Sequence, residues 1–141
     1  MSNLNDGTMS HRMKQSRAAL DRWEDELGFP SCGDTCPVDT ADVEMILAMD
    51  RRRLSELSGR QAAEYAFVLA QFSFYVQRRV NRCHAFIRWA NYNRRAMNGS
   101  DAARLERLKQ DAEIKITRIE YLTKRLEFMS QCLHRIGWAA R

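Results

Sequence analysis

Residues 102–136, AARLERLKQDAEIKITRIEYLTKRLEFMSQCLHRI, decide the fold class of this chain. Their apolar side chains recur at steps of three and four, the period of a helix that buries one stripe. The stripe consists of Leu105, Leu108, Ala112, Ile116, Ile119, Leu122, Leu126, Met129, Leu133 and Ile136. A stripe sustained over this length is typical of the seam of a coiled coil. We therefore expect one long helix over about residues 102–136.

A second long helix is expected over about residues 61–97, because the preceding segment shows the same period. Between the two lies Asn98-Gly99-Ser100-Asp101. Asparagine and glycine accept the left-handed backbone of a tight turn, and Ser100 or Asp101 can cap the helix that follows. The two helices should therefore form a long antiparallel hairpin with coiled-coil-like packing.

The remaining residues predict a shorter helix and a polar N-terminal segment. Val43, Ile46 and Leu54 keep a helical period over about residues 41–57, and Gly59 should end or kink that helix. Residues 1–16 are polar and expected to be disordered, with a short helix over residues 17–27. The sequence thus predicts an all-α chain with an N-terminal segment, 1–38, and a helical hairpin domain, 39–141.

Composition bounds the class of protein. The chain has 141 residues, 45% hydrophobic and 29% charged, which is ordinary for a globular domain. Its longest apolar stretch, residues 62–76, is interrupted by Glu64 and Gln71 and is shorter than the roughly 20 residues a membrane helix needs. The polar N-terminus lacks a secretory signal. We expect a cytoplasmic protein without a membrane span.

The sequence offers no evident catalytic or metal site. Cys32 and Cys36 flank a turn and could supply half of a zinc site, but no second ligand pair follows at a suitable spacing. His11, His84 and His134 stand apart from any evident nucleophile or acid. We therefore predict no enzymatic activity, no metal and no cofactor.

The charge of the central helix is unusual. Residues 61–141 hold 15 basic and 7 acidic residues, whereas residues 1–60 hold 8 and 11. The window 65–100 contains six arginines, eight of the chain's 13 aromatic residues, and no acid or lysine. Arginine neutralises phosphates, and aromatic rings stack on bases. The predicted nucleic-acid-binding residues are Arg78, Arg79, Arg82, Arg88, Trp89, Tyr92, Arg94 and Arg95.

The central helix also carries two apolar faces. One face should pack on the final helix; it comprises Tyr65, Leu69, Phe72, Val76, Val80, Cys83, Ile87 and Ala90. The second holds Phe67, Phe74, Arg78, Arg82, Trp89 and Tyr92. A lone hairpin cannot bury both. The second face could pack on the helix near residues 42–57, on another copy of the chain, or on nucleic acid.

The C-terminal residues Tyr121, Leu126-Glu127-Phe128, Ser130, Leu133 and Ile136-Gly137-Trp138 resemble the end of the UvsY-type recombination mediators of tailed phages. Similarity of layout extends over about residues 42–141. The resemblance implies a homo-oligomer in the host cytoplasm that binds single-stranded DNA. It also implies a function in DNA recombination and repair, in which the protein loads a RecA-like recombinase onto strands covered by single-strand-binding protein.

On that resemblance, the basic and aromatic positions of the central helix would contact the strand. Assembly would be driven by Leu122, Leu126, Leu133 and Ile136 of the final helix. The alternative is a non-enzymatic helical scaffold or adaptor that acts through protein contacts. Salt separates the two, because phosphate binding weakens with ionic strength and an apolar interface does not.

Overall fold

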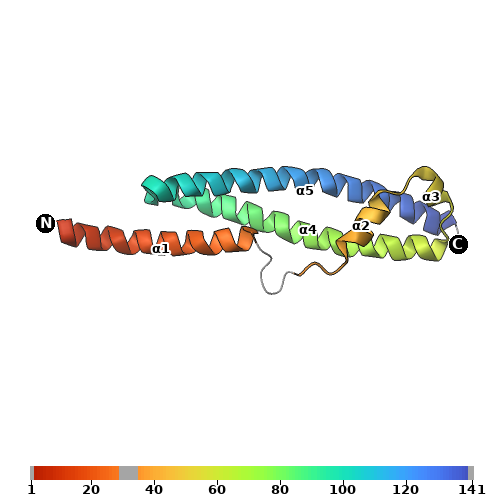
Figure 1. Cartoon of the computed structure of the whole chain (residues 1–141), viewed down its shortest axis with the longest axis horizontal. Coiled ribbons are helices and arrows are strands. Elements are labelled where there is room, and N and C mark those ends of the chain that lie inside the picture. Colours follow the sequence, from red (N-terminus) through yellow and green to blue (C-terminus); the bar gives the residue numbers. More distant parts are fainter. Residues whose placement is uncertain (1, 29–34, 140–141) are drawn as a thin grey trace. The chain divides into compact units, whose positions relative to one another are not determined.

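The computed structural model describes residues 2–28 and 35–139. For residues 2–13 it describes the backbone alone. The elements in chain order are α1 (Ser2–Gly28), α2 (Thr40–Leu47), α3 (Arg51–Ser55), α4 (Gly59–Asn93), the 3₁₀ turn η1 (Arg94–Ala96) and α5 (Gly99–Ala139). The described residues contain no strand, so the predicted all-α class is confirmed (Figure 1).

Helices α4 and α5 form the predicted hairpin and pack against each other, close to the expected bounds. Gly99 adopts φ +57, the left-handed conformation expected of the Asn98-Gly99 turn. At the other end of α4, Ser58 and Gln61 form a capping box. The Gln61 N–H donates to Ser58 Oγ at 3.1 Å, and the Ser58 N–H donates to Gln61 Oε1 at 3.0 Å. This reciprocal cap sets the start of α4 at Gly59.

The segment predicted as one helix over about residues 41–57 is divided into α2 and α3, which corrects that expectation. The division has a local cause. Ala48 is the C-cap of α2. Asp50 has an extended backbone conformation, and its carboxylate accepts a hydrogen bond from the Arg53 N–H at 2.8 Å. Aspartate at this position starts a new helix. Asp39 caps α2 in the same way, at 2.9 Å from the Ala41 nitrogen.

The chain separates into two compact units. Unit 1 comprises residues 1–33 and 80–116, and unit 2 comprises residues 34–79 and 117–141. Each contains parts of α4 and α5, because both long helices continue from one unit into the other. Each unit has a hydrophobic core of its own.

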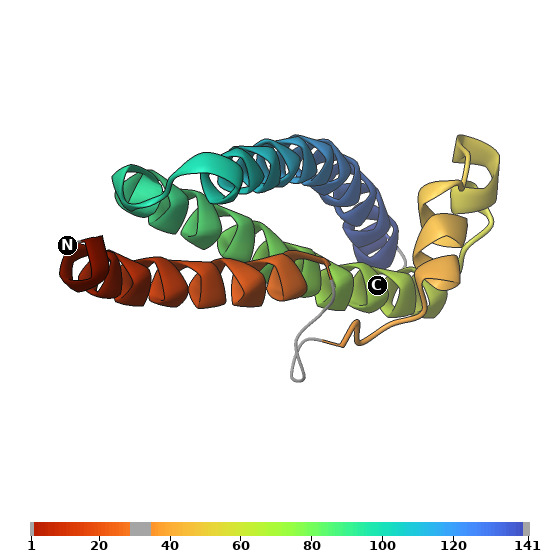
Figure 2. The same cartoon turned by 60° about the vertical axis from the view of Figure 1, so that its left-hand side comes forward.

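In unit 1, α1 packs beside the parts of α4 and α5 that adjoin their turn (Figures 1 and 2). Helix α1 begins at Ser2, so it is longer than the helix expected over residues 17–27. Leu20 and Leu27 of α1 are buried with Phe86 of α4 and Leu105 of α5. The Trp23 ring lies 5.5 Å from that of Phe86, in an edge-to-face arrangement.

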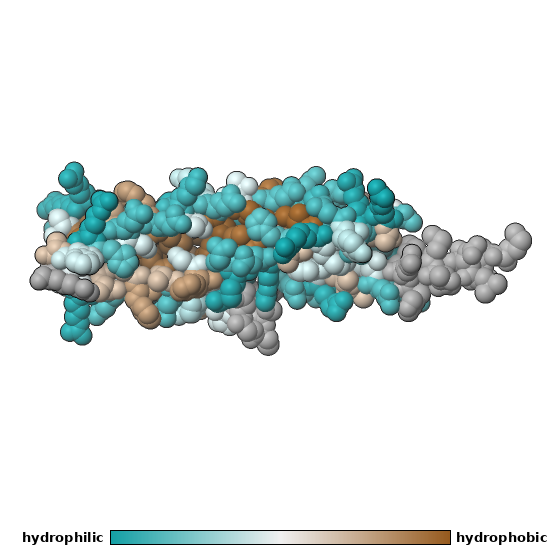
Figure 3. Space-filling view, turned by 180° about the vertical axis from the view of Figure 1, so that it is seen from behind, coloured by the Kyte–Doolittle hydropathy of each residue, from teal (hydrophilic) through white to brown (hydrophobic). Residues whose placement is uncertain are grey.

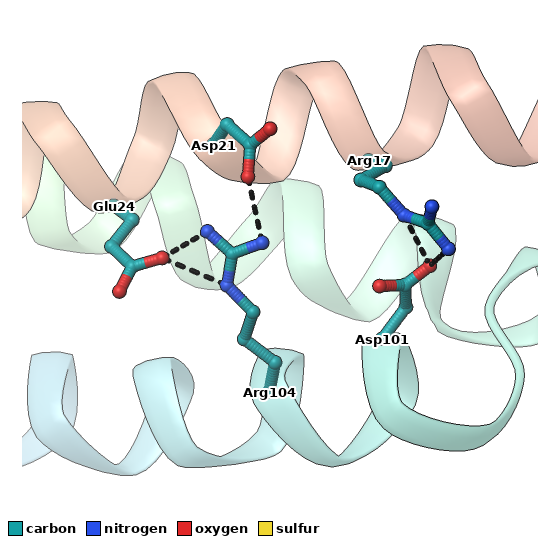
Figure 4. Close-up of polar contacts among 5 residues, drawn as sticks. All are labelled: Arg17, Asp21, Glu24, Asp101 and Arg104. Carbon is teal, nitrogen blue, oxygen red and sulfur yellow. Dashed lines mark hydrogen bonds and ion pairs between the residues drawn. The ribbon is translucent and has the colours of Figure 1, made fainter.

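Ion pairs also hold α1 in unit 1 (Figure 4). Arg104 of α5 donates to Glu24 from Nε at 2.8 Å and from a terminal nitrogen, and its other terminal nitrogen lies 2.7 Å from Asp21. These hydrogen bonds, that to Glu24 first, raise the pKa of Arg104 above its ordinary value. Arg17 pairs with Asp101 at 3.0 Å. Lys115 Nζ donates to the Leu27 carbonyl at 2.7 Å, which places a cation at the C-terminal end of α1.

Replacing Arg104 with methionine should weaken the docking of α1, because methionine keeps the hydrophobic stem but loses both carboxylate contacts. We expect unit 1 to lose about 1 kcal/mol of stability, since the carboxylates are partly exposed. Hydrogen exchange of the α1 amides measures this loss. Arg107→Met removes an exposed arginine of the same helix and should leave the exchange unchanged.

In unit 2, α2 lies across α4 (Figure 2). Val43 and Ile46 of α2 are buried with Leu69 and Phe72 of α4 and with Leu126 of α5. Within the described residues, no helix is long and apolar enough to cross a membrane.

Candidate nucleic-acid interface

The outer face of α4 in unit 1 is polar and basic. Its exposed residues, continued into η1, are Asn81, His84, Arg88, Asn91, Tyr92 and Arg95. The chain has no acidic residue between Tyr65 and Ser100, so no carboxylate of the same helix segment offsets these arginines. Tyr92 is 89% exposed. We call this set the basic face; it combines charge for phosphates with one accessible ring.

The other two predicted arginines of unit 1 are Arg94, which is exposed but paired, and Arg82. Arg94 Nε lies 3.1 Å from Glu106 Oε1, so this guanidinium forms an ion pair with α5. Arg82 is half-buried on α4. Of the predicted arginines in this unit, Arg88 and Arg95 are therefore the two with exposed side chains on the basic face.

Trp89 was predicted to bind nucleic acid, and the structure places it against α1. Its ring centroid lies 6.3 Å from that of Trp23 and 6.0 Å from that of Phe86. Trp89 is half-buried at the edge of the unit 1 core. Part of the second apolar face of α4 is thus covered by α1, an element that was not among the expected occupants.

The remaining predicted arginines, Arg78 and Arg79, lie in unit 2 beside Tyr75. Their guanidinium carbons are 6.0 and 5.9 Å from the Tyr75 ring centroid, within the range of cation–π attraction. Arg79 also donates to the Tyr75 hydroxyl at 3.5 Å. Arg78 is exposed and Arg79 is half-buried. The predicted site residues are therefore distributed between the two units. Four of the arginines, Arg78, Arg88, Arg94 and Arg95, are exposed, as is Tyr92.

The outer face of α4 in unit 2 is apolar instead of basic. Ala63, Phe67, Ala70 and Phe74 follow one another at steps of four, three and four, and all four are exposed. Phe67 is 64% exposed and Phe74 is 70% exposed. We call these four residues the apolar stripe. Large aromatic rings at this exposure are typical of an interaction surface.

A groove adjoins the apolar stripe, between α4 and α5 of unit 2. Its volume is about 330 Å³. It is lined by Ala63, Ala66, Phe67, Ala70, Leu133, His134, Gly137 and Trp138. Small residues of α4 line one side of the groove, and the exposed ring of Trp138 contributes to the other. Figure 3 shows hydrophobic residues reaching the surface of one face of the chain between rows of hydrophilic ones.

The four residues predicted to drive assembly lie in the core of unit 2. Leu126 and Leu133 are buried, and Leu122 and Ile136 are half-buried against the same cluster. They pack on α4 and α2 within one chain. The exposed aromatic residues of α5 are Tyr121, Phe128 and Trp138, which lie outside the apolar seam. Large aromatic side chains outside the apolar seam are visible in the sequence, so the exposure of these three residues could have been predicted from it.

The residues considered for metal binding are separated or lie outside the described part. Cys32 falls among residues 29–34, which the structure does not describe, and the Cys36 thiol donates to the Val38 carbonyl at 3.2 Å. Cys83 is buried in unit 1, and Cys132 is half-buried in unit 2. Across residues 2–28 and 35–139, no group of three or more potential ligands comes together.

No protein-family model, curated protein or solved structure matches this chain. The arrangement of its own side chains is therefore what supports a function. Two surfaces stand out: the basic face of unit 1 and the apolar stripe of unit 2.

Proposed function

We propose that this chain binds single-stranded DNA through the basic face of unit 1 and acts without chemistry of its own. The observation that carries the proposal is the 89% exposure of Tyr92 on a helix face whose charged groups, Arg88 and Arg95, are both arginines. An exposed aromatic ring gains free energy when a partner covers its face, and a nucleic-acid base can be such a partner by stacking on it.

The proposal favours a single strand over a duplex for a geometric reason. A single strand exposes the faces of its bases, so one base can stack on Tyr92 while neighbouring phosphates meet Arg88 and Arg95. In a duplex the bases are already stacked, and only the phosphates remain for the arginines. The role in loading a RecA-like recombinase, implied by the resemblance to the UvsY-type mediators, would follow from such binding. It belongs to the same proposal.

The test is the affinity of the full chain for fluorescent oligothymidylate and for a duplex of the same length, measured by anisotropy. Oligothymidylate should bind more tightly. For a single strand, the logarithm of the binding constant falls with the logarithm of the salt concentration with a slope of about −0.7 per neutralised phosphate. If Arg88 and Arg95 each neutralise one phosphate, a fourfold rise in salt should therefore lower the affinity about sevenfold.

The matched control is Arg107→Ala, compared with Arg88→Ala. Arg107 is an exposed arginine of α5 in the same unit, one helical turn from the exposed Asp111. Removal of Arg88 should weaken binding and reduce the salt slope, whereas removal of Arg107 should do neither. Equal binding to strand and duplex, or affinity that does not change with salt, would contradict the proposal.

A second candidate function, a helical adaptor that acts through protein contacts, is favoured by a different observation. The apolar stripe exposes Phe67 and Phe74 in unit 2, and neither ring is suited to phosphates. On this alternative the chain would bind a protein through the stripe, and oligothymidylate would not bind.

A further inference from the structure

The apolar stripe of unit 2 has a spacing that can pack on itself. Ala63, Phe67, Ala70 and Phe74 alternate small and large side chains at the four-three-four spacing of a coiled-coil core. An exposed helix face with this pattern presents both knobs and the spaces that accept them. The structure has all four residues on the surface of α4, where a second helix can reach them.

We propose that the apolar stripe binds the same stripe of a second copy of this chain, with the two α4 segments antiparallel about a twofold axis. In this register Phe67 lies opposite Ala70 of the second copy, and Ala63 lies opposite Phe74 of the second copy. One alignment places every phenylalanine against an alanine. A twofold contact requires a surface that is complementary to itself, and this spacing provides it.

The charges beside the stripe agree with the same register. Glu64, Gln71 and Arg78 recur every seven residues and form one flank of the stripe. A twofold axis between antiparallel helices brings the same flank of each copy together. In this register Glu64 and Arg78 of the second copy lie on the same flank, about 7.5 Å apart along the helix axis at 1.5 Å per residue, a distance that the two side chains can span. The twofold axis repeats this contact between Arg78 and the second Glu64.

The opposite flank of the stripe distinguishes antiparallel from parallel packing. That flank consists of Ala66 and Ser73, which carry no charge. In a parallel pair, the flank with Glu64 and Arg78 would face Ala66 and Ser73 of the second copy, and no ion pair would form. The charge complementarity therefore supports the antiparallel arrangement. Glu64 already lies 3.4 Å from Arg60, so in the dimer it would be shared between two arginines.

The groove beside the stripe completes the contact. Phe74 of the second copy would lie over Ala63, which lines the groove together with Phe67 and Trp138. The volume of about 330 Å³ can accommodate an aromatic ring. Burying the ring there removes apolar surface of Phe74 and of Trp138 from water together. The groove and the stripe are thus parts of one interface.

The contact is short, so the dimer should be weak. Residues 63–78 span about 24 Å of helix at 1.5 Å per residue, which places the interface at the small end of stable protein contacts. A dissociation constant in the micromolar range is expected. The inference is independent of the proposed DNA binding, because Arg88, Tyr92 and Arg95 lie in unit 1.

The experiment is sedimentation velocity on the full chain over about 1 to 100 µM, a range around the expected dissociation constant. The wild-type chain should pass from monomer to dimer. Glu64→Arg and Arg78→Glu should each weaken the dimer about tenfold or more, because each variant places like charges together twice. An equimolar mixture of the two variants should dimerise again, since both contacts of the mixed dimer then pair opposite charges, one with the wild-type polarity and one with reversed polarity.

Two further variants separate the interface from general effects. Phe74→Ser should weaken the dimer, whereas Phe128→Ser, at a phenylalanine that is 67% exposed on α5, should not. Helicity by circular dichroism should be unchanged in all four variants, because the replaced side chains are largely exposed. A chain that stays monomeric throughout, or a mixture that does not dimerise, would overturn the proposal.

Discussion

Replacing Phe86 with alanine should lower the free energy of unfolding of unit 1 by about 3–5 kcal/mol, the usual cost of truncating a fully buried phenylalanine. Phe86 is 0% exposed, and its ring lies within 6.0 Å of the rings of Trp23 and Trp89. The cavity would thus form where α1 meets α4. Denaturant unfolding followed by circular dichroism and by tryptophan fluorescence measures the effect, because Trp23 and Trp89 both report on this site.

The control for this truncation is Phe128→Ala. Phe128 has the same side chain but is 67% exposed on α5 of unit 2, so its removal should change stability by about 0.5 kcal/mol or less. If Phe86→Ala cost no more than Phe128→Ala, the packing of α1 over Phe86 would be wrong.

Replacing Tyr92 with alanine should weaken the binding of oligothymidylate about 5- to 150-fold, which corresponds to about 1–3 kcal/mol for one stacked base. Because Tyr92 is 89% exposed, its truncation should leave the fold intact. The affinity for duplex DNA should change little, since a duplex offers no base face to the ring. Anisotropy titrations at constant salt, with thermal unfolding in parallel, measure both effects.

Two controls test whether the Tyr92 ring itself is responsible. Tyr92→Phe keeps the ring and should retain most of the affinity. Tyr121→Ala removes a tyrosine that is 69% exposed on α5 of unit 2 and should have no effect. A loss in Tyr92→Phe as large as that in Tyr92→Ala would assign the role to the hydroxyl and contradict stacking.

The hairpin could be predicted from the sequence because its signals are local. Asn98-Gly99 marks the turn where Gly99 has φ +57, and the three-four spacing marks both long helices. The break between α2 and α3 has a local signal too, the Asp50 cap of Arg53. It was missed because Leu54 continues the apolar period across the break.

The position of α1 could not be predicted, because its partners are far away in the sequence. Nothing near Trp23 indicates that it meets Phe86 and Trp89, and nothing near Glu24 points to Arg104. For the same reason the sequence alone does not reveal that Trp89 lies against α1. Periodicity shows that a residue faces an apolar surface but does not say which one.

The same limit applies to the residues predicted to drive assembly. The spacing of Leu126 and Leu133 is equally compatible with packing inside one chain and between chains. In the structure they are used within unit 2. The apolar stripe that remains exposed is short, and its alternation of alanine with phenylalanine resembles an ordinary buried face when only the sequence is read.

The polar contacts of α1 also bear on the order in which the chain acquires its structure during synthesis. Arg104 and Lys115 lie 80 and 88 residues after Glu24 and Leu27, their partners on α1. Helix α1 therefore cannot complete its contacts until the chain has been translated to about residue 116, well into α5. Over that interval Trp23 and Leu20 lack the surface that buries them in the finished protein. Because α1 is synthesised before its partners, we expect it to dock after α4 and α5 have formed their hairpin.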